Sequence, residues 1–356
     1  MSERMTFAKI TQDSRLFSRD EYVENFGGIV RDVLRMFQSD TAKNALHQAE
    51  EYIKTLQPVG LPAHIPVRGR LSFGDFDNAP ELARGEVAAV DGTLPLPMQK
   101  FTAGQAICAG IGSVSYRRRL ESSVHGYTST PMIQRVSSTT EYIDMLEQAQ
   151  MSGINPSAYM RFYEMKHAAS LQEPYIFIDG TLIYEWLANQ DIGRGLYKTT
   201  LSKKPAIGVI KNLKDNVRFQ FIGSVLLQGE YVIIESVYTH LSDLVRKRKD
   251  THELQWNADS DFVGLSQNIF RGLFKPRDKF FGFECHQNHL LEMLRIMAAD
   301  CQMNQPGHEI PYLLNLVDKE IQSFFRPNVL KDEIAYQLSK ESEALFFMEG
   351  DEHNFR

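Results

Sequence analysis

The chain has 356 residues, of which 43% are hydrophobic, so it can bury a core sufficient for one large domain or two small ones. Its formal net charge is −6, which excludes a globally basic surface, and any contact with nucleic acid must therefore be local. The apolar stretches fall short of the ~20 residues that span a bilayer, and the start (MSERMTFAKI) has no apolar signal core, so we expect a cytoplasmic protein without membrane contact.

The N-terminal part of the sequence predicts helices followed by a connector. Residues 19–56 carry apolar side chains at helical spacing, and Asp40 is a suitable start for a second helix. Residues 57–83 contain repeated Pro and Gly, which favour a connector with little regular structure. The expected division is a helical segment (1–60), a connector (61–83), a compact domain (84–325) and an acidic C-terminal tail (326–356), loose after about residue 340.

Strands and helices alternate within the expected compact domain. Strands are predicted at 86–91, 105–116, 174–179, 205–211, 217–226, 230–236 and 279–284. Helices are predicted at 139–150, 156–171, 287–300 and 311–325. This order indicates an α/β fold with a mixed sheet flanked by helices, in which 217–236 forms a hairpin closed at Gln228-Gly229.

Two short stretches resemble each other: AAVDGTLPL (88–96) and IFIDGTLI (176–183). Both apolar runs are continuous rather than alternating, which indicates central strands buried on both faces, each ending at an aspartate. One interpretation is a simple Asp-Gly turn. A phosphatase of the haloacid-dehalogenase type is excluded, because the position of its nucleophile, two residues before the acid, holds Ala89 and Phe177.

A second interpretation places Asp91 and Asp179 in one site. If the two strands are neighbours, their carboxylates converge and repel each other, and a divalent cation offsets that repulsion. Mg²⁺ or Mn²⁺ suits oxygen ligands, and zinc does not suit this sequence, because Cys285-His286-x-x-His289 lacks a matching second pair. The three scattered cysteines also form no disulfide framework.

Two further acids stand where apolar residues are expected. Glu164 lies on the stripe of Met160, Ala168 and Leu171 in one predicted helix, and Asp318 lies on a similar stripe in the helix at 311–325. Either acid could instead be a carboxylate at the edge of its stripe. Taken together with Asp91 and Asp179, they favour a metal site with four carboxylates.

The order of these pieces resembles the NurA family of prokaryotic DNA-processing nucleases. The likeness covers about 84–325 and includes the first Asp-Gly-Thr, RFYEMKHAA, YIFIDGTLI, IGVIKNL and HEIPYLLNLVDKEI. It implies a ribonuclease H-like fold and a Mn²⁺-dependent homodimeric nuclease with 5′–3′ exonuclease and single-strand endonuclease activity on DNA. It also implies partnership with a hexameric HerA-type ATPase. By position, Asp91, Glu164 and Asp179 match the family's metal ligands.

The C-terminal motif departs from the family pattern. Where archaeal members have a Tyr and, eight residues on, a His, this chain has Ile310 and Asp318. Asp318 can still hold a metal, whereas no His stands at this position to act as a proton donor. Two alternatives stay open for His308: a substitute acid or base, or a surface histidine.

Basic residues suggest where DNA phosphates could bind. Lys211 ends an apolar strand, which fits either a phosphate contact at the mouth of the acidic site or a lysine that reaches solvent. Two basic runs could follow a DNA strand or simply be solvated: Arg117, Arg118 and Arg119, and the run at 246–249 with Arg246 and Arg248.

The sequence therefore predicts a metal-dependent nuclease that hydrolyses DNA phosphodiesters by the two-metal route. The helical segment 19–56 is a candidate contact for the ATPase or for a second copy of the chain, or it packs on the nuclease core. Two rival functions remain: a DNA-binding or assembly subunit without catalysis, and a ribonuclease H-like enzyme that acts on RNA.

Overall fold

The computed structural model divides the chain into two compact units, Met1–Lys54 and Thr55–Arg356. It describes residues 26–341 apart from 29, 32–33, 36–37, 72–78, 102–103, 130–154, 214–215, 249–254, 305–309 and 327–328. In the first unit, helix α3 (Asp40–Thr55) begins at the predicted residue. The hydroxyl of Ser39 accepts a hydrogen bond from the N–H of Ala42 at 3.2 Å, which satisfies one free donor of the first turn.

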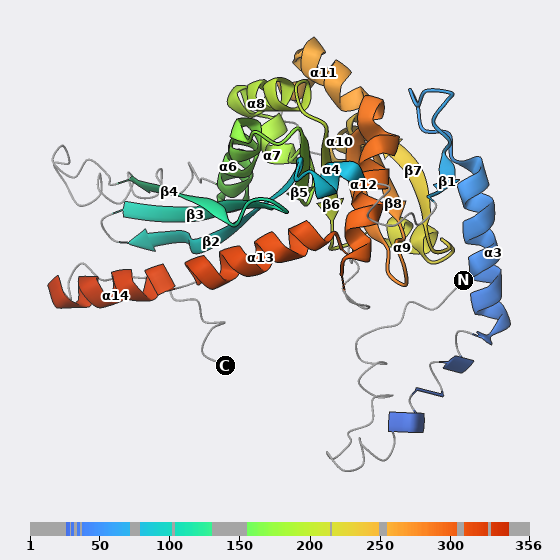
Figure 1. Cartoon of the computed structure of the whole chain (residues 1–356), viewed down its shortest axis with the longest axis horizontal. Coiled ribbons are helices and arrows are strands. Elements are labelled where there is room, and N and C mark those ends of the chain that lie inside the picture. The colour runs from blue at the N-terminus through green and yellow to red at the C-terminus, as the bar shows by residue number, and fades with distance from the viewer. Residues whose placement is uncertain are drawn as a thin grey trace. The chain divides into compact units, whose positions relative to one another are not determined.

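The described part of the second unit forms a nine-stranded sheet in the order β1-β7-β8-β9-β6-β5-β2-β3-β4 (Figure 1). The strands are β1 (Arg68–Arg70), β2 (Val87–Phe101), β3 (Gly104–Ser115), β4 (Glu121–Ser129), β5 (Tyr175–Asp179), β6 (Ala206–Ile210), β7 (Glu230–Ser236), β8 (Ile269–Phe274) and β9 (Phe281–His286). β2, β5 and β6 are parallel to one another at the centre, and the other pairs are antiparallel. The expected mixed α/β architecture is confirmed.

Helices cover both faces of this sheet. They are α4 (Pro80–Ala83), α6 (Pro156–Ser170), α7 (Glu185–Ala188), α8 (Asp191–Leu201), α9 (Val217–Gly223), α10 (Val237–Arg248), α11 (Ser260–Gln267), α12 (Leu290–Gln302), α13 (Tyr312–Phe325) and α14 (Val329–Glu341). Along β2, Val87 and Ala89 pack into one core cluster, with α12 and α13, while Ala88 and Val90 pack into another, with α6. Helices α6 and α13 therefore lie on opposite faces of the central strands, as Figure 1 shows.

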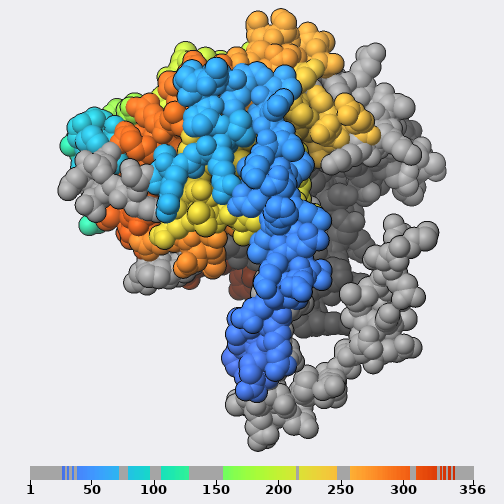
Figure 2. Space-filling model, turned by 90° about the vertical axis from the view of Figure 1, so that its right-hand side faces the viewer, coloured from blue at the N-terminus to red at the C-terminus, as the bar shows by residue number. Residues whose placement is uncertain are grey.

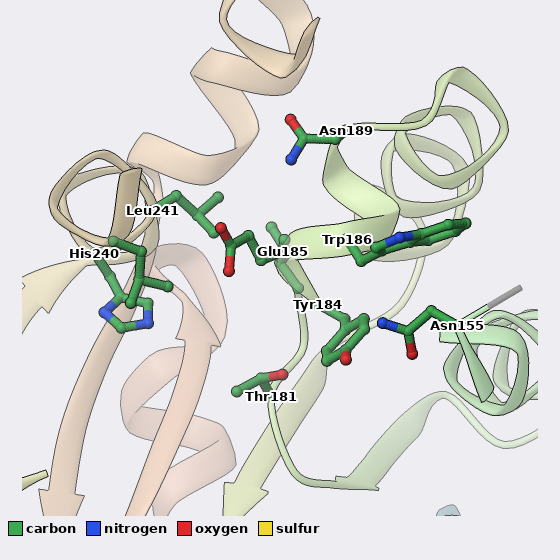
Figure 3. A pocket seen from close by; sticks show the side chains of 10 residues that line it. Asn155, Thr181, Tyr184, Glu185, Trp186, Asn189, His240 and Leu241 are labelled. Carbon is green, nitrogen blue, oxygen red and sulfur yellow. The ribbon is translucent and has the colours of Figure 1, made fainter. Parts of the chain in front are cut away.

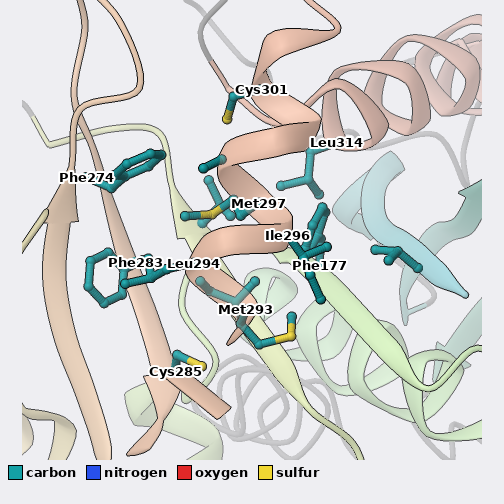
Figure 4. Packing of buried hydrophobic residues seen from close by; sticks show 14 of the residues in the cluster. Phe177, Phe274, Phe283, Cys285, Met293, Leu294, Ile296, Met297, Cys301 and Leu314 are labelled. Carbon is teal, nitrogen blue, oxygen red and sulfur yellow. The ribbon is translucent and has the colours of Figure 1, made fainter. Parts of the chain in front are cut away.

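Helix α12 forms the centre of the first core cluster. Met293, Leu294 and Met297 are fully buried, and they belong to the same cluster as Phe177 of β5 and Phe283 of β9 (Figure 4). Burial of each such side chain stabilises the fold by roughly 1.5–3 kcal/mol. Since Phe177 is two residues before Asp179, this core fixes the strand that carries one of the candidate acids.

The structure corrects several elements expected from the sequence. Residues 217–226 were expected as a strand and contain helix α9 instead, so the hairpin at Gln228-Gly229 is wrong as well. The side chain of Asn216 starts this helix by accepting a hydrogen bond from the N–H of Phe219 at 3.1 Å. Strand β2 does not stop at Asp91 but continues to Phe101, because β3 remains paired beside it.

Other regions hold more regular structure than expected. The connector contains β1, which pairs with β7. In the space-filling view, the light-blue surface of the connector lies beside yellow surface from the middle of the chain (Figure 2). No element was predicted at β4, β8, α7, α8, α10, α11 or α14, while the helix expected at 139–150 and the tail after 341 lie outside the described residues. Cys108, Cys285 and Cys301 are all free and buried. Among the helices described, none has the length and apolar character needed to cross a membrane.

Candidate active site

Three neighbouring parallel strands bring charged side chains to one edge of the sheet. Ala89 of β2, Phe177 of β5 and Val209 of β6 all belong to the same core cluster. Two residues further along these strands come, in the same order, Asp91, Asp179 and Lys211. Because side chains alternate with a period of two, these three share one face, and Lys211 Nζ lies 3.0 Å from Asp179 Oδ2.

Helix α6 delivers Glu164 to this edge from the other face. The helix starts with Pro156, and the Asn155 side chain accepts a hydrogen bond from the N–H of Ala158 at 3.1 Å. Glu164 is 1% exposed, and its Oε2 is 2.7 Å from Arg161 Nη1. Its second oxygen, Oε1, is buried without a hydrogen-bond partner among the described residues. An orphaned buried carboxylate oxygen is costly and calls for a ligand.

The glycines of the two Asp-Gly-Thr stretches make room for these side chains. A Cβ on Gly92 would lie 2.6 Å from Glu164 Oε1, too close for any real contact. Gly180 has a φ of +84°, which favours glycine, and a Cβ there would collide with the guanidinium of Arg161. The backbone of Gly180 fits the turn interpretation, whereas Gly92 lies within β2 and does not. In both stretches, glycine lets a charged side chain of α6 reach the edge of the sheet.

We call Asp91, Glu164 and Asp179 the acid cluster. Burial, followed by the charges of Asp179 and Glu164, holds the pKa of Asp91 well above its ordinary value, against the opposing effect of Lys211. Burial also raises the pKa of Glu164, although its ion pair with Arg161 opposes the shift. Three carboxylates thus face two cations, and the cluster keeps an excess of negative charge.

This excess is compatible with a divalent cation. All the donors are carboxylate oxygens, which suits Mg²⁺ or Mn²⁺, and one of them is buried without a partner. In their present positions, however, the described residues include no group of three His, Cys, Asp or Glu side chains that could hold a metal. Lys211 and Arg161 instead contact the carboxylates of Asp179 and Glu164. Arg161, which also donates to the backbone carbonyl of Asp179, was not singled out from the sequence.

The fourth predicted acid is not joined to the acid cluster. Asp318 is half-buried on α13, and its Oδ1 accepts a hydrogen bond from Gln322 Nε2 at 2.7 Å. Helix α13 packs on the same face of the sheet to which Asp91 belongs. A role for Asp318 as a metal ligand stays a prediction. His308, the predicted acid or base, lies outside the described residues.

The first predicted basic run lies away from the acids, and the second is described only as far as Arg248. Arg117, Arg118 and Arg119 follow Ser115, which pairs with Ala88 at the start of β2, about 10 Å along the strand from Asp91. Arg118 is already engaged with the carboxylates of Glu121 and Glu173. At the end of α10, Arg246 is exposed, with its Nη1 3.5 Å from Asp243 Oδ1, and Arg248 is the last residue of the helix.

A second group of buried charges was missed in the sequence. Glu235 of β7, Arg271 of β8 and Glu284 of β9 stand opposite one another in register, and we call them the ionic row. Arg271 Nε is 2.9 Å from Glu284 Oε1, and its Nη1 is 3.5 Å from Glu235 Oε1. Glu284 Oε2 accepts a hydrogen bond from the N–H of Leu182 at 2.8 Å, which anchors the loop that follows Asp179.

Glu235, at the β7 end of the ionic row, also has basic partners. Arg218 Nη1 lies 2.7 Å from Glu235 Oε2, and His240 Nδ1 lies 3.5 Å from Glu235 Oε1. Burial is the largest single influence on the pKa of Glu235 and would raise it, but His240, Arg271 and Arg218 together lower it. The only sequence signal for this row was a charged residue within each otherwise apolar strand.

The comparisons with known proteins come from structure alone. No protein-family model matches the chain, and no curated protein sequence matches it. The chain is similar in structure to NurA nucleases. The NurA nuclease from Sulfolobus solfataricus has a TM-score of 0.44 and 10% sequence identity, covering 92% of this chain and 99% of that chain.

Two further solved structures are similar over most of their length. NurA bound to dAMP and manganese has a TM-score of 0.40 and 10% identity, covering 86% of this chain and 94% of that one. Endonuclease V from Bacillus subtilis has a TM-score of 0.32 and 13% identity, covering 83% and 96%. Because these TM-scores are 0.44 or lower, the function has to be inferred from the residues of the site.

Proposed function

We propose that the protein is a metal-dependent nuclease that hydrolyses phosphodiester bonds in DNA. The observation that carries this proposal is the acid cluster, where three carboxylates from β2, α6 and β5 face only two cations and Glu164 Oε1 is buried without a partner among the described residues. A site with this excess of negative charge attracts divalent cations, and it repels an anionic substrate until they bind.

The residues of the site have distinct roles in this proposal. Asp91, Glu164 and Asp179 would hold Mn²⁺ or Mg²⁺, with Asp318 as a further candidate ligand. Bound divalent cations supply Lewis-acid chemistry, by polarising a phosphoryl oxygen and lowering the pKa of water. Lys211, now 3.0 Å from Asp179, is free to contact a substrate phosphate once the carboxylate has another partner. Arg161 fixes the orientation of Glu164 through the 2.7 Å ion pair.

The finer assignment follows the NurA resemblance of the sequence. We propose a ribonuclease H-like arrangement, 5′–3′ exonuclease and single-strand endonuclease activity, a homodimer, a hexameric HerA-type ATPase as partner, and a cytoplasmic location. The order of the motifs from Asp91 to Asp318 supports this assignment. The ATPase would supply what a chain of net charge −6 lacks, because it would tether DNA beside the acids.

The test is cleavage of end-labelled single-stranded and duplex DNA, and of RNA of the same sequence, by the purified full-length chain. After EDTA treatment, Mn²⁺ should restore cleavage, Mg²⁺ should restore it less well, and Ca²⁺ should not, because it prefers longer and more numerous oxygen contacts.

The outcomes separate the rival functions. Cleavage that survives EDTA contradicts a metal mechanism. DNA binding without cleavage in any metal supports an assembly subunit, and cleavage of RNA alone supports the ribonuclease alternative.

A further inference from the structure

A cavity of about 320 Å³ lies beside the acid cluster, between the loop that follows Asp179 and helix α10 (Figure 3). Its wall includes Thr181 of that loop, Trp186 of α7 and His240 of α10. Thr181 is two residues from Asp179, so their Cα atoms are at most about 7 Å apart. A group bound in this cavity is therefore close enough to belong to the same nucleotide strand as a phosphate at the acids.

Two aromatic side chains line the cavity. Trp186 is 40% exposed, so its ring is accessible to a ligand, and Tyr184 lines the same cavity. Figure 3 shows both rings extending from the segment that follows β5. Aromatic rings that remain accessible beside a phosphodiester site are suited to stack on a base, because every base has a π face.

Buried side chains hold the aromatic segment in position. The backbone N–H of Tyr184 donates to the hydroxyl of the buried Tyr197 at 2.9 Å, and Glu284 of the ionic row holds Leu182 at 2.8 Å. The segment 182–184 is therefore anchored at two points by buried side chains. A rigid platform loses little entropy when a ligand stacks on it.

The polar groups of the cavity also fit a base. Asn189 Oδ1 is buried and has no hydrogen-bond partner among the described residues. Such an acceptor requires a donor, and each DNA base has an N–H donor on its pairing edge. In duplex DNA these donors are already used by the complementary strand, so an unpaired base satisfies Asn189 and a paired base does not.

We propose that this cavity, the base pocket, binds one unpaired nucleobase of a single-stranded segment whose phosphodiester lies at the acid cluster. Trp186 and Tyr184 stack on the base, and Asn189 accepts a hydrogen bond from its edge. The second half of this statement rests on the proposed nuclease function, whereas binding of the base itself does not. The pocket selects single strands over duplexes without reading sequence.

The chain offers a direct reporter, because it has two tryptophans, Trp186 and Trp256. In a full-length W256F variant, all tryptophan fluorescence comes from Trp186. A short oligothymidylate should quench it, in EDTA and again with Ca²⁺. An abasic strand of the same length and charge, and a blunt duplex, should leave it unchanged. Equal quenching by the abasic strand would overturn the proposal, since that result requires phosphate contacts alone.

Affinity measurements with matched variants complete the test. W186A should weaken binding of the oligothymidylate about 5- to 150-fold, while W256A should bind as the parent does. N189L should weaken it less, and neither W186A nor N189L should change affinity for the abasic strand. W186A and W256A variants of equal affinity would exclude the pocket.

This result is distinguishable from the fate of the nuclease proposal. If no metal supports cleavage but quenching still depends on the base, the pocket stands and the nuclease function fails. If W186A binds the oligothymidylate as tightly as the parent and cleaves single strands normally below saturation, the nuclease function stands and the pocket fails.

Discussion

The acid cluster and the ionic row are both buried groups of charged side chains, but their charges balance differently. In the ionic row, Glu235 and Glu284 are matched by Arg271 and Arg218, and the pKa of Glu235 is lowered. In the acid cluster, three carboxylates face two cations, and the pKa values of Asp91 and Glu164 are raised.

This difference separates a structural role from a functional one. A buried charge that is fully paired stabilises the positions of the strands that carry it. A buried charge that its neighbours destabilise persists where a ligand or a reaction uses it. The ionic row also supports the acid cluster, because Glu284 anchors Leu182 in the loop that starts at Asp179.

The largest expected effect is on cleavage. D91N and D179N each remove one ligand charge while they preserve the shape of the side chain, and each should lower the rate of Mn²⁺-dependent DNA cleavage by about 1000-fold or more. The assay is single-turnover cleavage of end-labelled DNA. E320Q, which alters an exposed glutamate of α13, is the matched control and should cleave normally. Normal cleavage by D91N or D179N would remove the acid cluster from the mechanism.

The same type of substitution in the ionic row should reduce stability instead. E284Q leaves Arg271, which is 4% exposed, without its closest carboxylate, and breaking a buried pair costs about 3–5 kcal/mol. Urea denaturation should show this loss, compared with E320Q. An unchanged free energy of unfolding would mean that the ionic row is not a structural element. Residual cleavage by folded E284Q should still depend on Mn²⁺.

Asp300 of α12 is a buried carboxylate outside both groups. It sharpens the comparison because its hydrogen-bond partners are neutral. It accepts hydrogen bonds from the Tyr116 hydroxyl at 2.5 Å and from the N–H of Leu313 at 3.0 Å, yet burial raises its pKa to about 6. The unfolded chain releases this proton near pH 4, whereas the folded chain keeps it to about pH 6. The contribution of Asp300 to the stability of the wild type should therefore fall as pH rises through that range and then become level.

D300N has no such proton to release. The difference in unfolding free energy between wild type and D300N should change by up to about 3 kcal/mol between pH 4 and 6, at the expense of wild type. Urea denaturation of both proteins at several pH values measures this difference. A difference that does not vary with pH would show that Asp300 has an ordinary pKa.

Sequence could predict the part of the site that depends on local hydrophobic periodicity. Continuous apolar runs predicted buried central strands at β5 and the start of β2, and helical spacing predicted that Glu164 points inward. That the two strands are neighbours was only a condition of the prediction, and the parallel pairing of β2 with β5 meets it. The residues that could not be predicted depend on distant partners. Arg271 interrupts the apolar run of β8 and is acceptable only because Glu235 and Glu284 lie beside it in the fold.

The clearest error in the prediction of secondary structure concerns a short apolar run. The stretch from Val217 to Leu226 fits a strand by composition, but its buried Phe219 and Ile222 also fit one face of a helix. The helix that forms is capped by Asn216 and buries Phe219 and Ile222 in the folded protein. Local periodicity therefore predicts elements reliably where a run is long, and tertiary contacts decide where it is short.

The smallest expected effect is on the free energy of unfolding, and its sign tests the comparison between the acid cluster and the ionic row. Because Asp91 is buried beside Asp179 and Glu164, D91N should raise the free energy of unfolding by about 1 kcal/mol in EDTA, whereas E284Q lowers it. Mn²⁺ should then reverse the order: at a concentration 100-fold above its dissociation constant it stabilises wild type by about 2.7 kcal/mol, and D91N gains less. Thermal denaturation with and without Mn²⁺ measures both effects. If D91N is less stable than wild type in EDTA, the carboxylates of the acid cluster do not repel one another, and the case for a cation between them fails.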